Sequence, residues 1–299
     1  MIGRRLLSLA VTAVAVTGLL FLDAPAWASD KPGRLNVVWH PSEPRIGDVA
    51  WVQVPDTRGA RAVEGSVAGR SLSFFPYGDG YAALIGFDLD GKAGPQVWRV
   101  AVVRADGDPL TRQGRLKIRS RSFSVQHLTL PSVMVDLDPE TERRAAAEGE
   151  RLRALTRMIT PERLWRGRFT RPVAGESPGT GFGARRIING QPRAAHSGTD
   201  YAAPRGTPVV AVNDGRVALV GDYFFPGRFV AIDHGLGLYT LYFHLDAVSV
   251  TEDERVTRGQ TVGAVGSTGR ATGPHLHFAA QLGSARIDPA MLLGLDALD

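Results

Sequence analysis

Residues 207–222 read TPVVAVNDGRVALVGD, two β-prone runs of alternating residues separated by Asn213-Asp214-Gly215. Alternation with a period of two is typical of a strand with one buried face, and Asp-Gly between two such runs is a β-hairpin signal. The later runs RFVAIDHG, LYTLYFHL, QTVGAVG and HLHFAAQL have the same character, and DHGLG is a second hairpin signal. The pattern predicts a compact antiparallel β domain over residues 169–299, with a helix only in the last few residues.

The remaining sequence also favours a mainly β protein. Short β-prone runs separated by turn residues recur over residues 35–127, which predicts a β-sandwich-like N-terminal domain at residues 29–130. A helical linker is expected at residues 131–168, because Asp138 is a good N-cap and Pro139 suits the first helical position. One thin apolar stripe predicts that this helix packs on one side only.

Residues 1–28 have the features of a secretory signal peptide. Two arginines precede an apolar run, and Ala26-Trp27-Ala28 is a small-x-small cleavage site. The alternative, an uncleaved membrane anchor, is disfavoured because the apolar run is short for a span of about 20 residues. We expect cleavage before Ser29, no membrane association afterwards, and a periplasmic, secreted or cell-wall-associated protein.

Composition limits the chemistry and the partners. The chain of 299 residues has no cysteine, so disulfides are excluded and any metal site must use His, Asp or Glu. The net charge is +5, and the basic excess lies in residues 29–170 without a long Lys/Arg run. Such dispersed charge favours a mild attraction to an anionic cell wall over a nucleic-acid surface.

Histidines are concentrated in the C-terminal domain, which holds five of the seven. His275 and His277 are one residue apart, and strand spacing would put both on one face, as it would His244 and Tyr242. His196 lies four residues before an aspartate, in a segment that we interpret as a strand end or loop. Two imidazoles and one carboxylate satisfy the protein ligand count of a catalytic zinc site, but spacing alone leaves open which three residues bind.

Three segments together resemble a known family. They are FGARRIINGQPRAAHSGTDYAAPRGTPVVAVNDGRV at residues 182–217, YFHL at residues 242–245 and STGRATGPHLHF at residues 267–278. In this order they resemble the lysostaphin-like, LytM-type peptidoglycan metalloendopeptidases over about residues 169–292. The resemblance implies two sets of site residues: Zn²⁺ ligands His196, Asp200 and His277, and the catalytic pair His244 and His275.

The resemblance implies a zinc-dependent endopeptidase that hydrolyses peptide cross-links between peptidoglycan stem peptides. A D-Ala–diaminoacid bridge is favoured over a glycine bridge. No glutamate stands near the motifs, so His244 and His275 are expected to handle protons or stabilise the oxyanion. The N-terminal domain is expected to dock on the wall or to cover the groove.

Two alternatives belong to other functional classes. One is a non-catalytic peptidoglycan-binding or amidase-activating protein of the same fold, against which the intact set of five residues argues. The other is a basic structural protein that binds anionic polymers through residues 29–170, which leaves the histidines unexplained.

Several other residues are weaker candidates. Asp233 or His234 could orient a ligand imidazole, although a role in the turn is favoured for both. Tyr242 could line the groove, and Tyr201 has no assigned role. The remaining candidates are glycines expected to serve backbone geometry: Gly198, Gly235 and Gly237.

Overall fold

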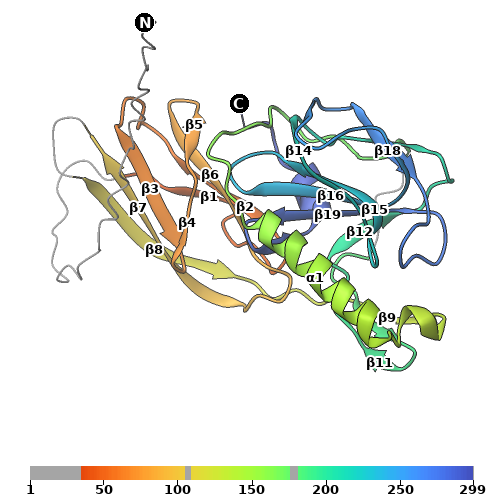
Figure 1. Ribbon diagram of the computed structural model, residues 1–299. Helices are drawn as coiled ribbons and strands as arrows, with labels where there is room; N and C mark the ends of the chain where they lie inside the picture. Colours follow the sequence, from red (N-terminus) through yellow and green to blue (C-terminus); the bar gives the residue numbers. More distant parts are fainter. Residues whose placement is uncertain (1–34, 105–108, 176–180, 299) are drawn as a thin grey trace, which may run out of the picture. The chain divides into compact units, whose positions relative to one another are not determined.

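The computed structural model describes residues 35–104, 109–175 and 181–298 (Figure 1). The signal peptide predicted at residues 1–28 lies outside these described residues. Within them the chain is mainly β with antiparallel sheets, as the sequence predicts. Neither of the two α-helices in these ranges is long and apolar enough to cross a membrane.

Two four-stranded sheets form the N-terminal part. Their strand orders are β1-β2-β6-β5 and β4-β3-β7-β8 (Figure 1). The first sheet consists of β1 (Val38–His40), β2 (Val49–Val54), β5 (Phe75–Tyr77) and β6 (Gly80–Gly86). The second consists of β3 (Ala62–Val67), β4 (Arg70–Ser71), β7 (Gly94–Val103) and β8 (Leu110–Ile118).

The first sheet is buried on both faces. On β6, Ala83 and Ile85 join the apolar core shared with the second sheet. Their neighbours Ala82 and Leu84 belong instead to the large core of the C-terminal part. The burial of β6 is therefore almost continuous and does not alternate.

A nine-stranded antiparallel sheet forms the C-terminal part, with the central order β12-β19-β16-β15-β14-β17 (Figure 1). In addition, β13 pairs with β18, β18 with β16, and β20 with β19. The nine strands are β12 (Gly198–Tyr201), β13 (Pro208–Val210), β14 (Gly215–Tyr223), β15 (Gly227–Asp233), β16 (Leu238–Val248), β17 (Arg255–Val256), β18 (Thr261–Val265), β19 (Leu276–Leu282) and β20 (Ala285–Ile287).

One of the two hairpin predictions is wrong. DHGLG does join two paired antiparallel strands, β15 and β16. Asn213-Asp214-Gly215, in contrast, separates β13 from β14, and these two strands pair with other partners. The turn is engaged elsewhere, since Asn213 Oδ1 accepts from the backbone of Arg166 and Asp214 Oδ1 from that of Arg258. These contacts turn the chain from one strand pair to another.

Helix α1 (Pro139–Thr156) matches the helix expected from the sequence. The Asp138 carboxylate accepts from the backbone N–H groups of Glu140 and Thr141 at 2.9 and 3.0 Å, which caps the helix. Of the apolar stripe expected at Leu152, Leu155 and Ile159, the two leucines pack on the core of the nine-stranded sheet. Ile159 lies beyond the end of the helix and is exposed, so the expectation is wrong for this residue. The two remaining helical segments are η1 (Ser132–Met134) and α2 (Pro289–Leu293).

A small third sheet connects the two halves of the sequence. It contains β9 (Val125–Leu128), β10 (Arg185–Ile188) and β11 (Gln191–Pro192), with β9 parallel to β10. The sequence pattern had grouped residues 125–128 with the N-terminal strands. Their parallel partner lies about 60 residues further along the chain, a distance over which local patterns carry no pairing information.

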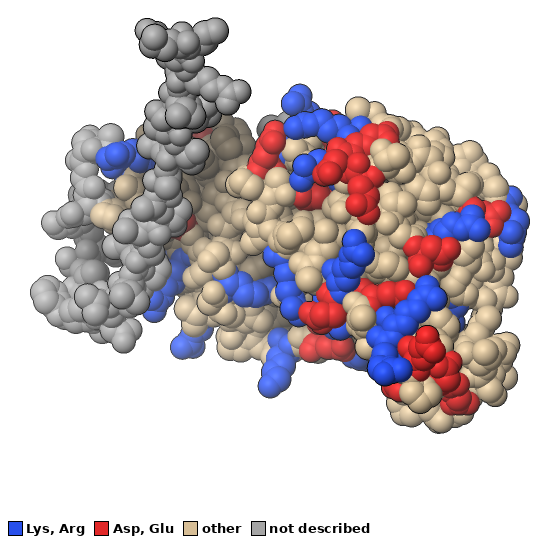
Figure 2. Space-filling view, in the orientation of Figure 1, with Lys and Arg blue, Asp and Glu red and all other residues tan. Residues whose placement is uncertain are grey.

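Charged side chains are dispersed on the visible surface. Figure 2 shows acidic and basic side chains interspersed over the described part of the face in view. This distribution agrees with the scattered placement of Lys and Arg along the sequence.

Candidate metal centre

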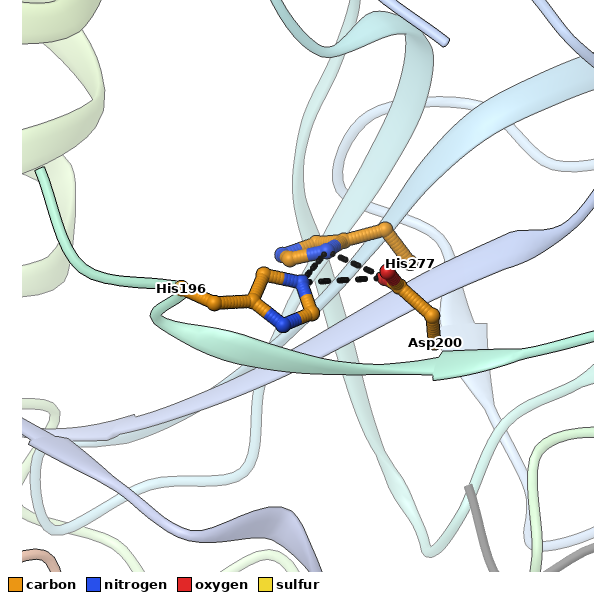
Figure 3. Close-up of side chains that lie close together, drawn as sticks. All are labelled: His196, Asp200 and His277. Atoms are coloured by element: carbon orange, nitrogen blue, oxygen red, sulfur yellow. Dashed lines mark hydrogen bonds and ion pairs between the residues drawn. The ribbon is translucent and has the colours of Figure 1, made fainter. Parts of the chain in front are cut away.

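Two neighbouring strands bring three candidate ligands together (Figure 3). Asp200 on β12 is paired directly with His277 on β19. His196 lies two residues before β12, and its ring turns toward the other two side chains. Directly paired residues of antiparallel strands hold their Cβ atoms about 5 Å apart, so the register itself places carboxylate and imidazole in contact.

The three ligand atoms form a tight triangle. His277 Nδ1 lies 2.8 Å from Asp200 Oδ1 and 2.8 Å from His196 Nε2. His196 Nε2 lies 3.0 Å from the same carboxylate oxygen. Ligands at about 2.0–2.2 Å from one ion lie at most roughly 4 Å apart, so the three atoms fit a single metal ion. Together they form a group able to hold a metal.

Burial and charge favour the ligating forms of these residues. The His196 and His277 side chains are buried, and burial lowers the pKa of His277 to about 4, which keeps its imidazole neutral. Burial alone would raise the pKa of the Asp200 carboxyl, but hydrogen bonds from His196 and His277 outweigh it and hold that pKa well below its ordinary value. A neutral imidazole and an ionised carboxylate are the forms that bind metals.

Gly198 is required for the position of His277. An added Cβ at Gly198 would lie 2.6 Å from His277 Nε2 and 2.5 Å from the backbone oxygen of Phe278. Neither contact can be relieved by a flexible side-chain end, because one atom is backbone and the other belongs to a buried ring. The glycine therefore lets β12 approach β19 closely enough for the three ligands to meet.

We expect Gly198→Ala to displace His277 and to weaken metal binding by about 10- to 100-fold, the range for loss of groups that orient a ligand. Competition with a chromogenic chelator measures this affinity. Gly273→Ala is the matched control, since an added Cβ there meets no atom within 4 Å. Equal metal affinities for the two variants would contradict this role of Gly198.

The other two histidines lie next to the ligand group. The His275 ring is centred 4.8 Å from that of His244, and its Nε2 is 3.8 Å from Asp200 Oδ1. The His244 ring is centred 6.0 Å from that of His277. His275 precedes β19 and forms an isolated bridge with Gly266, so it approaches Asp200 from just outside the strand. The prediction that His275 and His277 face the same side is confirmed, because both rings approach the same oxygen, Asp200 Oδ1.

Backbone carbonyls select the tautomers of His244 and His275. His244 Nδ1 lies 2.8 Å from the oxygen of Thr268, and His275 Nδ1 lies 2.8 Å from that of Gly273. A carbonyl oxygen only accepts, so each Nδ1 carries the hydrogen and each Nε2 of a neutral ring keeps its lone pair. Burial, aided by the neighbouring histidines, lowers the pKa of His244 to about 3. His244 is therefore an unprotonated base at neutral pH.

Comparison with known proteins agrees with this geometry. Residues 194–289 match the sequence profile of peptidase family M23. The crystal structure of an M23 peptidase from Pseudomonas aeruginosa is 30% identical to this chain, with a TM-score of 0.63, over 84% of this chain and 96% of that one. The chain belongs to peptidase family M23.

Two curated relatives are similar to the C-terminal part of this M23 chain. The peptidoglycan DD-endopeptidase ShyA of Vibrio cholerae is 44% identical over 98 residues, which cover 32% of this chain and 23% of ShyA. The DD-carboxypeptidase/endopeptidase Mpg of Neisseria meningitidis is 48% identical over 94 residues, which cover 31% of this chain and 22% of Mpg. The M23 chain thus spans less than a quarter of the length of these relatives.

The prediction that His244 and Tyr242 share a face is wrong. His244 has φ of 63°, a left-handed conformation that interrupts the alternation of β16. Tyr242 consequently points into the core, where its hydroxyl accepts from the Val212 N–H at 3.0 Å, and it does not line the groove. Phe243 lies on the site face, paired with His277 and stacked on its ring.

The weaker candidates have structural roles. His234 is buried, and its ring nitrogens contact Asp214 O and Thr240 Oγ1 at 2.7 Å each. The Asp233 carboxylate accepts from the Thr160 hydroxyl and the Gly235 N–H, which holds the turn. None of these contacts reaches the ligand group. The preference for a turn role is therefore confirmed.

Two further weak candidates also serve the fold. Tyr201 is buried in the large core beside Phe278. Gly235 has φ of +84°, and an added Cβ would lie 1.8 Å from the Glu162 oxygen, so that position requires glycine.

We expect the buried imidazole of His234 to make the free energy of unfolding smaller in acid. Burial lowers its pKa from 6.5 to about 4, so below pH 6.5 the unfolded chain binds the proton more tightly than the folded chain does. We expect the free energy of unfolding contributed by this group to be constant above pH 6.5. It should fall by up to about 3 kcal/mol as the pH decreases to about 4. Urea unfolding at several pH values, with a chelator present, measures the effect.

The control for this prediction is His234→Gln, which keeps hydrogen-bonding groups but cannot take up the proton. All other titratable groups are the same in both proteins, so the difference between the two pH profiles isolates His234. Profiles that run parallel between pH 7 and 4 would contradict the assignment.

A cavity of about 290 Å³ opens beside the ligands. His196, His244 and His277 line it together with parts of helix α1, of β10 and of the segment that follows β11. Sequence reasoning missed three arginines in this lining: Arg186, Arg193 and Arg270. Two of them lie in the motif segment at residues 182–217 and the third in the segment at residues 267–278. A basic residue without a known partner does not by itself indicate a binding site, so the sequence did not single them out.

Proposed function

We propose that this M23 chain is a zinc-dependent endopeptidase that hydrolyses the peptide cross-links of bacterial peptidoglycan. The observation that carries the proposal is the meeting of His196, Asp200 and His277 within 3.0 Å, with His244 and His275 beside them. The substrate class rests on the relatives named as peptidoglycan DD-endopeptidase and DD-carboxypeptidase/endopeptidase.

The proposed zinc ligands are His196 Nε2, Asp200 Oδ1 and His277 Nδ1. Zinc accepts a mixed set of imidazole and carboxylate donors, and three protein ligands are typical of a catalytic site. When bound, zinc supplies Lewis acidity and lowers the pKa of a coordinated water from 15.7 to about 7. Asp200 keeps its negative charge, and Arg186 Nη2, 3.6 Å from its second oxygen, helps to hold the carboxylate in place.

His244 and His275 are the proposed catalytic pair. Each has its Nδ1–H fixed on a backbone carbonyl, so the basic Nε2 is the atom able to accept a proton from the nucleophile and return it to the leaving amine. A protonated ring also stabilises negative charge that develops on the carbonyl oxygen of the substrate. We propose that the two rings share these tasks.

The remaining assignments extend this proposal to the whole chain. Residues 1–28 act as a cleaved signal peptide, and the mature protein works outside the cytoplasm, in the periplasm or at the cell wall. The N-terminal domain comprises residues 29–130, and residues 131–168 link it to the peptidase domain at residues 169–299. The role proposed for the N-terminal domain is to dock on the wall or to cover the groove. Helix α1 of the linker borders the groove, because Ala145, Gly149 and Leu152 line the cavity.

The test combines metal content with product analysis. Protein comprising residues 29–299 is assayed for zinc by mass spectrometry and for release of soluble muropeptides from purified sacculi. We expect one zinc per chain, activity lost on chelation and restored by added zinc, and product masses that identify a cleaved cross-link. Zinc binding with no release of muropeptides, even after metal is restored, would instead favour the non-catalytic binding protein.

A further inference from the structure

Three guanidinium groups meet in the cavity beside the ligand group. Arg186 belongs to β10, Arg193 follows β11, and Arg270 lies in the loop before β19, yet all three line the same cavity of about 290 Å³. Arg186 and Arg270 are half-buried, while Arg193 is exposed at the rim. Separate segments of the chain thus direct positive charge to one place.

These three charges are poorly neutralised by the protein. Arg193 Nη2 donates to Gln191 Oε1 at 2.8 Å, and the guanidinium of Arg270 lies 4.1 Å from the centre of the Phe225 ring. Both partners are uncharged. Among the residues that the structure describes, Arg186 alone of the three faces a carboxylate, that of Asp200, at 3.6 Å. That carboxylate already accepts shorter contacts from His196 and His277.

The other acidic residue at the cavity is also engaged. Glu148 of α1 accepts from Arg144 Nε at 2.7 Å and from the Phe224 N–H at 2.7 Å, so both of its oxygens have partners. Burial is the main cause that lowers the pKa of Arg270, and the charges of Arg186 and Arg193 lower it further, so the three cations repel one another. An anion entering the cavity would relieve this repulsion.

We propose that Arg186, Arg193 and Arg270 form a carboxylate-binding subsite that holds a free carboxylate of the substrate peptide beside the ligand group. A planar guanidinium binds a carboxylate through two parallel hydrogen bonds, a geometry that uncharged amides do not match. The subsite selects a stem peptide with a free carboxylate next to the scissile bond, such as that of a diamino acid at a cross-link, over the amidated peptide. This inference rests on the proposed function.

The test measures binding separately from hydrolysis. Two cross-link peptides are compared that differ only in carrying a carboxylate or a carboxamide on the diamino acid. In both, the scissile amide is reduced to a methyleneamine, which cannot be hydrolysed. Calorimetry with the zinc-loaded mature protein is expected to show about 10-fold or more tighter binding of the carboxylate form, the range for a charge-assisted hydrogen bond.

Variants assign this preference to the arginines. We expect Arg193→Gln and Arg270→Gln each to reduce the preference at least about 3-fold, and the double variant to leave only the part that Arg186 supplies. Arg270→Lys keeps the charge but loses the paired hydrogen bonds, so it should retain part of the preference. Arg255→Gln is the matched control, because Arg255 is exposed on β17 and does not line the cavity. Arg193 is also exposed, so its variant tests the subsite without endangering the fold.

The outcomes separate this inference from the proposed function. Equal binding of the two peptides by the unmodified protein, or a preference that the double variant leaves undiminished, overturns the subsite whether or not the protein hydrolyses sacculi. An arginine-dependent preference without any hydrolysis of the matching cleavable peptide supports the subsite and refutes the endopeptidase. Arginine-dependent binding together with hydrolysis that follows the same preference supports both.

Discussion

His277→Ala is expected to abolish zinc binding and to lower muropeptide release by about 10³-fold or more. His277 Nδ1 lies 2.8 Å from each of the other two ligand atoms, and its removal leaves only His196 and Asp200. Two protein ligands are one fewer than a catalytic zinc site provides. Zinc content after dialysis and initial rates on purified sacculi measure the two effects.

The control for this variant is His127→Ala, which removes an exposed histidine on β9 outside the cavity. It should retain one zinc per chain and normal rates. A His277→Ala protein that kept its zinc and its activity would exclude this residue as a ligand. Thermal unfolding of both variants in the presence of a chelator shows whether either change affects the fold itself.

His244→Ala is expected to lower hydrolysis by about 10²–10⁴-fold while zinc content stays at one per chain. The ring is centred 6.0 Å from that of His277 and is not part of the ligand triangle, so its loss removes proton transfer without removing a donor to the metal. The effect should fall on kcat more than on KM, because the ring acts on the reacting atoms.

A second variant protects this prediction against a purely structural explanation. His244 has φ of 63°, a conformation that asparagine tolerates better than most residues, so His244→Asn tests the ring with little backbone strain. His244→Ala and His244→Asn should show similar losses of kcat. Near-normal rates in both variants would refute a catalytic role, and loss of zinc in both would show that His244 supports the ligand group instead.

The sequence predicts the β class from its periodicity, whereas the set of five site residues comes from the family resemblance, and spacing accounts only for its local pairs. The His-x-His spacing and the four-residue spacing of His196 and Asp200 act over distances where local geometry determines side-chain direction. Once β12 pairs with β19, Asp200 and His277 have to be neighbours. The N-cap at Asp138 is equally local, and the structure confirms it.

The errors occurred where a distant contact overrides the local pattern. The left-handed residue His244 shifts the alternation of β16, so Tyr242 enters the core and Phe243 takes the site face. Periodicity contains no sign of this interruption, because the alternation of apolar and polar residues does not report the φ angle of a single residue. The three arginines of the cavity are a second case, since their meeting depends on three loops and strand ends that no spacing relates.

The sheet β1-β2-β6-β5 has a consequence for how the protein unfolds. Leu84 and Phe75 lie in the same core as Trp165 and Ile287, and Gly86 approaches so closely that an added Cβ would lie 2.8 Å from the Ile287 side chain. Neither half of the chain can therefore lose its structure without uncovering apolar surface on the other. Heating should produce one cooperative transition rather than two, and a fragment of residues 169–299 should aggregate unless its uncovered core is made polar. The C-terminal part is thus not expected to fold as an independent domain, because the first N-terminal sheet completes its apolar core.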